Sequence, residues 1–173
     1  MTVTTRDADA ADAALLSELS RRTFVETFGH LYRPEDLAAF LAKFDEAGWR
    51  GELEDPAYQV RLAEADGEAV GFAKLGPLGL PVSPDRPALE LRQLYLLAST
   101  HGRGIAPVLM DWLLGEARRR GAAELYLSVW TQNHRARAFY ARYGFTFVAP
   151  YAFMVGEQAD EDEIWRLDLK ERR

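Results

Sequence analysis

The spacing of hydrophobic and polar residues changes most clearly in the middle of the chain. Residues 88–97 are rich in leucine and have the length of a strand, and hydrophobic residues over 105–113 then recur at the 3.6-residue period of one helix face. Gly121 is placed to end this helix in the left-handed conformation, after a run of arginines at the negative end of the helix dipole. The pattern predicts a strand, a turn over residues 101–106 and a helix that runs to Arg120.

Helical spacing also dominates the N-terminal third of the chain. Residues 2–6 have the β-branched content of a short strand. Residues 9–29 carry an apolar helical stripe between a capping aspartate and a terminal glycine, and residues 34–44 begin with a proline that suits the first helical position. A short helix over residues 46–54 is predicted to stop before Pro56.

The remaining pattern is that of strands separated by turns, with one further helix. The predicted elements are a hairpin with strands over 58–64 and 69–75 about an Asp66-Gly67 turn, a loop over 76–87, a strand over 124–129, a helix from Asn133 to Gly144, and strands over 145–148 and 163–169. This order predicts a mixed α/β (α+β) layer fold in which two helices cross over the sheet.

Length and composition predict one soluble, globular domain over residues 1–173. Hydrophobic residues make up 48% of the chain, enough for a sizeable core, and no run of about 18 apolar residues is present to span a membrane. The N-terminus lacks the apolar stretch of a secretion signal. We therefore expect a cytoplasmic protein.

Charge and residue usage exclude several classes of function. A net charge of -6 argues against nucleic acid or an anionic membrane as the main partner, and is compatible with a cationic substrate. The absence of cysteine removes disulfides, thiolate metal sites and cysteine nucleophiles. His30, His101 and His134 lie too far apart in sequence for a helical histidine pair, so no metal site is predicted.

The glycine turn before the central helix has two readings. Gly102 and Gly104 remove side chains from the first turn, which bares backbone N–H groups at the positive end of the helix dipole and suits a phosphate. The same glycines are also compatible with a tight strand-to-helix connection. A P-loop is excluded because no Lys-Ser or Lys-Thr follows, and a dinucleotide fingerprint fits badly because Pro107 stands at its third glycine position.

Three motifs in order resemble the GNAT superfamily of acyl-CoA N-acyltransferases over nearly the whole chain. Residues 101–106 match its Gln/Arg-x-x-Gly-x-Gly/Ala motif, with His101 where Gln or Arg is usual, and residues 90–96 match the preceding Glu-x-x-x-Leu-Tyr-Val strand. The downstream family motif Asn-x-x-Ala-x-x-x-Tyr-x-x-x-Gly-Phe is matched by Asn133, Ala136, Tyr140, Gly144 and Phe145. The resemblance implies a GNAT-like fold, with a central, mostly antiparallel twisted sheet of six or seven strands and helices on both faces.

The resemblance also implies acetyl-CoA as the acyl donor, with no metal. It assigns the CoA pyrophosphate to the backbone of the glycine turn, the pantetheine to the edge of the preceding strand, and the thioester to the region of Asn133 and Tyr140. The donor-binding residues so implied are Leu94, Tyr95, Leu96, His101, Gly102, Arg103, Gly104, Ile105, Ala106, Asn133 and Tyr140.

The chemistry of amine acetylation is consistent with these residue types. A backbone N–H near Leu96 is suited to stabilise the charge that builds on the thioester oxygen, and the Tyr140 hydroxyl is suited to protonate the departing thiolate. Glu90 is the candidate acceptor of the amine proton, directly or through water. Without cysteine, direct transfer in a ternary complex is favoured over a ping-pong route. Tyr140 also fits a core tyrosine, with Tyr143 as the rival acid, and Glu90 also fits a solvated strand end.

Within the superfamily, the chain is most similar to bacterial PaiA-type polyamine acetyltransferases. The shared runs are Leu127-Ser128-Val129-Trp130, Ala138-Phe139-Tyr140, Phe153-Met154-Val155-Gly156 and Thr23-Phe24-Val25-Glu26-Thr27-Phe28. This likeness implies a primary amine such as a polyamine as substrate, with Glu26, Phe28 and Tyr32 at the acceptor site. Protein N-termini, lysines and other small amines remain alternatives, as does a CoA-binding sensor without turnover, and a homodimer is left open.

Overall fold

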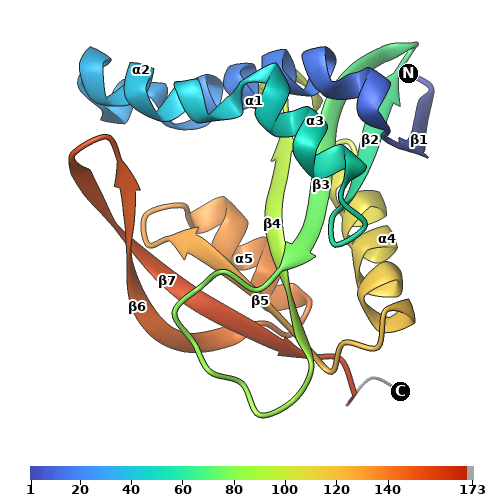
Figure 1. Ribbon diagram of the computed structural model, residues 1–173, viewed down its shortest axis with the longest axis vertical. Helices are drawn as coiled ribbons and strands as arrows, with labels where there is room; N and C mark the ends of the chain where they lie inside the picture. Colours follow the sequence, from blue (N-terminus) through green and yellow to red (C-terminus); the bar gives the residue numbers. More distant parts are fainter. Residues whose placement is uncertain (171–173) are drawn as a thin grey trace.

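A twisted mixed sheet forms the centre of the computed structural model, which describes residues 1–170. Over these residues the sheet has seven strands in the order β1-β2-β3-β4-β5-β7-β6 (Figure 1). The strands are β1 (Val3–Asp7), β2 (Gln59–Ala65), β3 (Glu68–Pro77), β4 (Ala88–Leu96), β5 (Glu124–Trp130), β6 (Thr146–Val155) and β7 (Gln158–Asp168). Only β4 and β5 pair in parallel within this part of the chain. The predicted mixed α/β fold with a mostly antiparallel sheet is confirmed.

Helices cover both faces of the sheet. They are α1 (Ala13–Phe28), α2 (Pro34–Leu41), α3 (Glu46–Glu54), α4 (Ile105–Arg119) and α5 (His134–Arg142). Strand β3 is buried at every position from Val70 to Gly76, which requires cover on both sides. Phe72 meets Trp49 of α3 on one face, and α4 packs against β2, β3 and β4.

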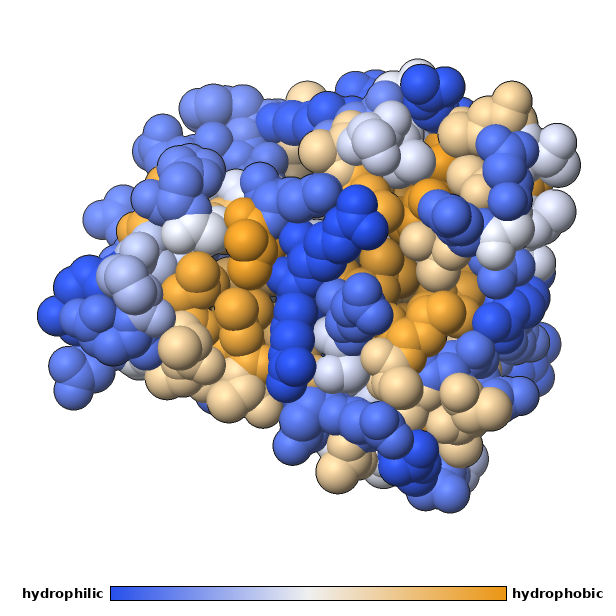
Figure 2. Space-filling model, turned by 90° about the horizontal axis from the view of Figure 1, so that it is seen from above, coloured by the Kyte–Doolittle hydropathy of each residue, from blue (hydrophilic) through white to orange (hydrophobic). Residues whose placement is uncertain are grey.

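The α1–α2 layer closes one side of the molecule. Figure 2 looks onto that side and shows hydrophilic residues interspersed with hydrophobic ones. Within residues 1–170, no helix combines the length and the apolar character needed to cross a membrane.

The two last strands are much longer than the sequence pattern predicts. Strands were expected over residues 145–148 and 163–169, but β6 and β7 extend to either side of Gly156 and form a hairpin arm. Pro150 is tolerated because β6 is an edge strand of the described sheet, and the acidic run 160–163 alternates between the two faces of β7 instead of forming a solvated turn. In Figure 1 this arm, drawn in red-brown, rises toward α2.

The tip of the β6–β7 arm is fixed to α2. The Glu157 N–H donates to the Asp36 carboxylate at 3.0 Å, and Arg33 donates to the same carboxylate at 2.9 Å. The Arg33 contact lowers the pKa of Asp36 below its usual value. Gly156 has a φ of 57°, and a Cβ atom there would lie 2.6 Å from the Asp36 Cα. Glycine is therefore required both by the backbone conformation and by the close approach.

Strands β4 and β5 pair at one end only. Their register covers Ala88–Glu90 against Glu124–Tyr126, after which the two strands diverge. Beyond this point β4 remains paired with β3, and β5 remains paired with β7 over its full length. The sheet is therefore split along its middle, with two strand edges facing each other across an opening.

We expect Gly156→Ala to destabilise the protein more than Gly67→Ala. Both glycines have a positive φ, 57° at Gly156 and 86° at Gly67. Alanine at either position must therefore adopt a left-handed backbone conformation, which costs about 1–2 kcal/mol. A Cβ at Gly67 meets nothing within 4 Å, whereas at Gly156 it collides with the backbone of Asp36. The extra loss should be about 1–3 kcal/mol in urea unfolding, the usual cost of overpacking. Equal losses would show that the arm is not held against α2.

Candidate active site

A cavity of about 570 Å³ occupies the opening between β4 and β5. It is lined by the free edge of β4, the end of β5, the turn before α4, and residues of α1, α5 and the β6–β7 arm. Apolar side chains and a few polar groups from segments distant in sequence meet in it. This is the usual composition of a small-molecule site.

The turn at one end of the cavity is built for backbone exposure. Gly102 and Gly104 have φ values of 77° and 79°, and a Cβ at either would meet nothing within 4 Å. The glycines therefore serve the left-handed conformation rather than a close contact. Gly104 is the N-cap of α4 and provides no side-chain cap, so the first N–H groups of this 15-residue helix are left for another acceptor. Both glycines, Ile105 and Ala106 line the cavity, so this end has the features that favour an anion.

His101 joins the turn to the end of β4. Its Nε2 lies 3.2 Å from the Leu96 carbonyl oxygen, and the residue lines the cavity. Arg103, predicted at the same site, is exposed and does not line it.

The free edge of β4 forms one wall of the cavity. Leu94, Tyr95 and Leu96 all line it, while the opposite edge of the strand is paired with β3. Alternate backbone N–H and C=O groups of β4 therefore face the opening. Such an edge can pair with an extended amide chain.

Tyr140 of α5 lines the cavity. It is 9% exposed, and its ring packs against Phe139 and Phe145 with centroids 5.6 and 5.7 Å away. Burial raises the pKa of the Tyr140 hydroxyl, so the phenol is protonated at neutral pH. Tyr143, the rival acid, donates to Asp111 at 3.4 Å and does not line the cavity.

Asn133 both caps a helix and borders the cavity. Its Oδ1 accepts the Ala136 N–H at 3.2 Å and caps α5, and the residue also lines the cavity. The cap and the cavity contact predicted for Asn133 are therefore compatible.

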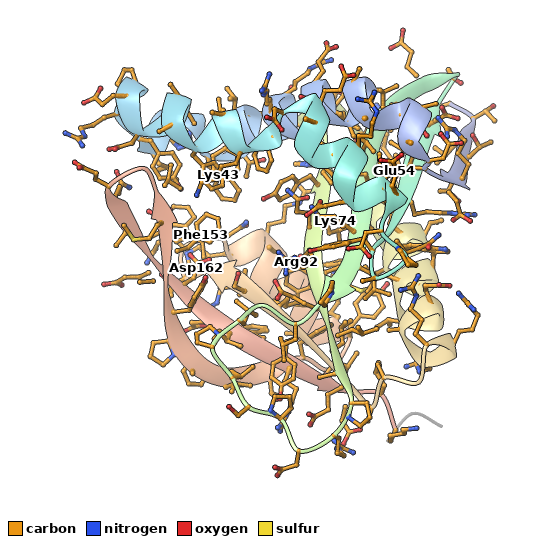
Figure 3. The ribbon with its side chains drawn as sticks, in the orientation of Figure 1. Lys43, Glu54, Lys74, Arg92, Phe153 and Asp162 are labelled. Carbon is orange, nitrogen blue, oxygen red and sulfur yellow. The ribbon has the colours of Figure 1, made fainter. Side chains whose placement is uncertain are left out.

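Aromatic side chains surround the far end of the cavity. Phe24 and Phe28 of α1 lie with ring centroids 5.1 Å apart, and Phe28 meets Trp130 at the end of β5 at 6.2 Å. Tyr32 and Phe153 complete the wall. Figure 3 shows Phe153 on the β6–β7 arm, below the α1–α2 layer. The predicted residues Phe28 and Tyr32 are thus brought to the cavity.

Two carboxylates of β7, which sequence reasoning missed, face this aromatic end. Asp160 accepts hydrogen bonds from the Tyr32 hydroxyl and from Gln158 Nε2, and Asp162 is 7% exposed (Figure 3). Burial, and then the charge of Asp160, raise the pKa of Asp162 to about 7. Burial is also the main cause that raises the pKa of Tyr95 to about 12, with a smaller contribution from Asp162. The signal in the sequence is the period-2 spacing of the two aspartates, which puts both on one face of a strand.

The structure does not bring Glu90 and Glu26 to the cavity. Glu90 accepts the Gly79 N–H at 2.9 Å and lies 3.8 Å from Arg92, and burial raises its pKa. Glu26 accepts the Ala98 N–H at 2.9 Å, so it ties α1 to the segment after β4. Among the described residues, no group of three histidine or acidic side chains is arranged to hold a metal ion.

Comparison with known proteins identifies the family of this chain. The sequence profile of the acetyltransferase (GNAT) family matches residues 16–145. An uncharacterized N-acetyltransferase of Lactobacillus delbrueckii subsp. lactis is 33% identical over 155 residues, which cover 87% of this chain and 88% of that protein. These matches confirm the family predicted from the motifs.

Solved structures of similar fold include proteins with the donor bound. The PaiA N-acetyltransferase of Thermoplasma acidophilum, in complex with coenzyme A, is 21% identical, covers 97% of this chain and 99% of its own, and has a TM-score of 0.77. YncA of Salmonella typhimurium, with acetyl-CoA, is 26% identical, covers 100% and 97%, and has a TM-score of 0.70. The likeness to PaiA is one of fold.

We expect Asp162→Asn to stabilise the protein at alkaline pH. The pKa of Asp162 is raised from 3.8 to about 7 in the folded state, so the folded state binds more protons than the unfolded state between these values. The contribution of Asp162 to stability is therefore present below about pH 4 and is lost as the pH rises through about 7. Relative to the parent protein, the variant should gain free energy of unfolding at about pH 8, by at most about 4 kcal/mol, and gain nothing near pH 4 in urea unfolding.

The exposed neighbour Glu161 on β7 provides the matched control. Glu161→Gln should leave the free energy of unfolding unchanged at both pH values. A gain for Asp162→Asn that does not depend on pH would contradict the raised pKa.

Proposed function

Since the chain belongs to the acetyltransferase (GNAT) family, we propose that it transfers the acetyl group of acetyl-CoA to a primary amine in this cavity. The observation that carries the proposal is the split between β4 and β5, which opens a cavity lined by the glycine turn before α4, the free edge of β4 and the buried Tyr140. These groups suit a pyrophosphate, an amide arm and a thioester, respectively. The similarity to YncA, whose structure contains acetyl-CoA, supports this donor.

The donor would be held mainly by backbone groups. The N–H groups between Gly102 and Ala106 suit the pyrophosphate, because the left-handed glycines keep side chains out of the turn. The edge of β4 at Leu94 to Leu96 suits the pantetheine as an added strand, and Asn133 borders the same path.

The reaction requires one proton to be removed from the amine nitrogen and one to be supplied to the departing thiolate. The free amine attacks the thioester carbonyl, and a backbone N–H near Leu96 stabilises the charge on its oxygen. The C–S bond then breaks, and the thiolate takes the proton of the Tyr140 hydroxyl. The new amide nitrogen releases its extra proton, which restores the phenol. Acetyl transfer is thus direct, without an acetylated residue.

We further propose a cationic amine, such as a polyamine, as the acceptor. The aromatic wall that includes Phe24, Phe28 and Tyr32 suits an alkylammonium ion, since aromatic faces attract cations. The carboxylates of Asp160 and Asp162 stand where Glu26 was predicted to act. The net charge of -6 favours the approach of a cation.

CoA should raise the melting temperature of the protein, because a ligand that prefers the native state stabilises it by mass action. Dephospho-CoA should act almost as well and pantetheine hardly at all, since pantetheine lacks the pyrophosphate. Gly104→Val should abolish the shift, because the side chain enters the anion site. Thermal unfolding by circular dichroism is the measurement.

Gly121→Val is the matched control for this test. Gly121 lies beyond the other end of α4 with a φ of 85° and open space around its Cβ position. This variant should incur the same backbone cost and keep the CoA shift. Equal stabilisation by pantetheine and CoA would contradict the pyrophosphate assignment.

Tyr140→Phe should lower turnover by about 10²-fold or more, the usual scale for a general acid, with CoA affinity within a few fold. The amine for this turnover assay is identified beforehand by mass spectrometry of the products that form from acetyl-CoA and a pool of polyamines, monoamines and peptides. Tyr143→Phe should leave turnover unchanged, since Tyr143 lies outside the cavity. Wild-type turnover of Tyr140→Phe would contradict its role. Absence of any acetylated product would favour a CoA-binding sensor.

A further inference from the structure

Within the described part of the chain no cation forms an ion pair with the two carboxylates of β7, Asp160 and Asp162, although Arg92, Arg135 and Arg142 also line the cavity. Asp160 is hydrogen-bonded by Tyr32 and Gln158, which are neutral, and Asp162 experiences only burial and the charge of Asp160. Burying an unbalanced carboxylate is costly, and native proteins seldom keep one without a use. The pair therefore lacks the positive charge that a substrate would bring.

A second buried side chain in the same cavity, which is hydrogen-bonded to Tyr95, has one polar atom without a partner. Gln93 of β4 lines the cavity and is 9% exposed, and its Oε1 has no hydrogen-bond partner within the described residues. Buried carbonyl oxygens are nearly always hydrogen-bonded, so this one stands ready for an N–H donor. A carboxylate pair and an unpaired amide oxygen together present acceptors only, which is the complement of an ammonium group with three donors.

We propose that Asp162 receives the ammonium group of the acceptor amine and takes its proton, with Asp160 and Gln93 positioning the nitrogen. This inference rests on the proposed function and gives Asp162 the role predicted for Glu90, which lies outside the cavity. In the step, one N–H bond of the ammonium breaks and its electron pair stays on nitrogen. The proton forms an O–H bond on Asp162 and later passes to solvent. The neutral amine then attacks the thioester.

The surroundings of Asp162 are suited to this transfer. Its titratable neighbours are Asp160 on its own strand, Tyr32 from the segment before α2, and Tyr95 on β4. Burial raises the pKa values of both tyrosines, so they stay neutral, and the charge of Asp160 makes Asp162 more basic. A base with a pKa near 7 combines a high ionised fraction with a useful proton affinity at neutral pH.

The first test is binding without turnover. CoA in place of acetyl-CoA gives a dead-end complex, into which n-butylammonium chloride is titrated by calorimetry. We expect wild-type protein to bind the cation at least about tenfold more tightly at pH 8.5 than at pH 5.5, because Asp162 is then ionised. Asp162→Asn should bind it about tenfold more weakly at pH 8.5 and lose the pH dependence, whereas Glu161→Gln should match wild type.

Failure of this inference can be distinguished from failure of the proposed function. Unchanged binding of n-butylammonium by Asp162→Asn, or no binding by wild type while CoA still binds, would overturn the role of Asp162 alone. Loss of CoA binding by wild type would overturn the donor site instead.

The second test separates a proton acceptor from a simple cation anchor. With the best amine of the product screen, kcat of Asp162→Asn at pH 7 should fall by about 10²–10⁴-fold, and should recover as pH rises and free amine becomes available. Asp160→Asn should move the acidic limb of the kcat/KM profile to lower pH, because it removes the charge that raises the Asp162 pKa. A raised KM with unchanged kcat in Asp162→Asn would overturn the proton transfer.

Discussion

The incomplete pairing of β4 with β5 is the constraint on which the rest of the structure depends. Only the first residues of the two strands are in register, so the remaining backbone groups on both edges need other partners. Such an opening in the middle of a sheet is stable only if the two halves are held together elsewhere. The chain passes from β4 to β5 through α4, which packs on the β2–β4 half, and the β6–β7 arm of the other half is fixed to α2 through Asp36. The cavity is thus a product of the sheet topology, and side chains only complete it.

Interactions between residues close in sequence made much of this fold predictable. Caps, terminal glycines and the Asp66-Gly67 hairpin turn, with φ values of 51° and 86°, are short-range features, and they fall where the sequence places them. The glycine turn and the Asn133–Tyr140 spacing are also local, and the structure brings them to one cavity. The lengths of β6 and β7 were missed because their outer halves are held by long-range pairing and by α2, against the local signals of Pro150 and the acidic run.

The end of the cavity formed by the aromatic side chains and the β7 carboxylates was less predictable for a related reason. Whether a carboxylate lies in a cavity depends on strand divergence and on contacts across the molecule. Glu90 precedes the point of divergence and bonds to Gly79, and Glu26 bonds to Ala98, although both residue types fit the chemistry. Asp160 and Asp162 lie on an arm whose register no local pattern specifies. The end of the cavity at the glycine turn is formed by backbone groups, which a glycine motif marks, whereas its aromatic and acidic end is formed by side chains brought together by tertiary packing.

The hydrogen bond from Ala98 to Glu26 makes α1 a mechanical link between the two ends of the cavity. Glu26 holds the segment that leads into the glycine turn, and Phe28, two residues later on the same helix, belongs to the aromatic wall of the cavity. A rigid helix cannot move at one of these points without moving at the other. Any free-energy coupling that results is reciprocal, so the donor changes the affinity for the amine by the same factor as the amine changes the affinity for the donor. The strength of that coupling then depends on α1 as well as on the groups that line each end of the cavity.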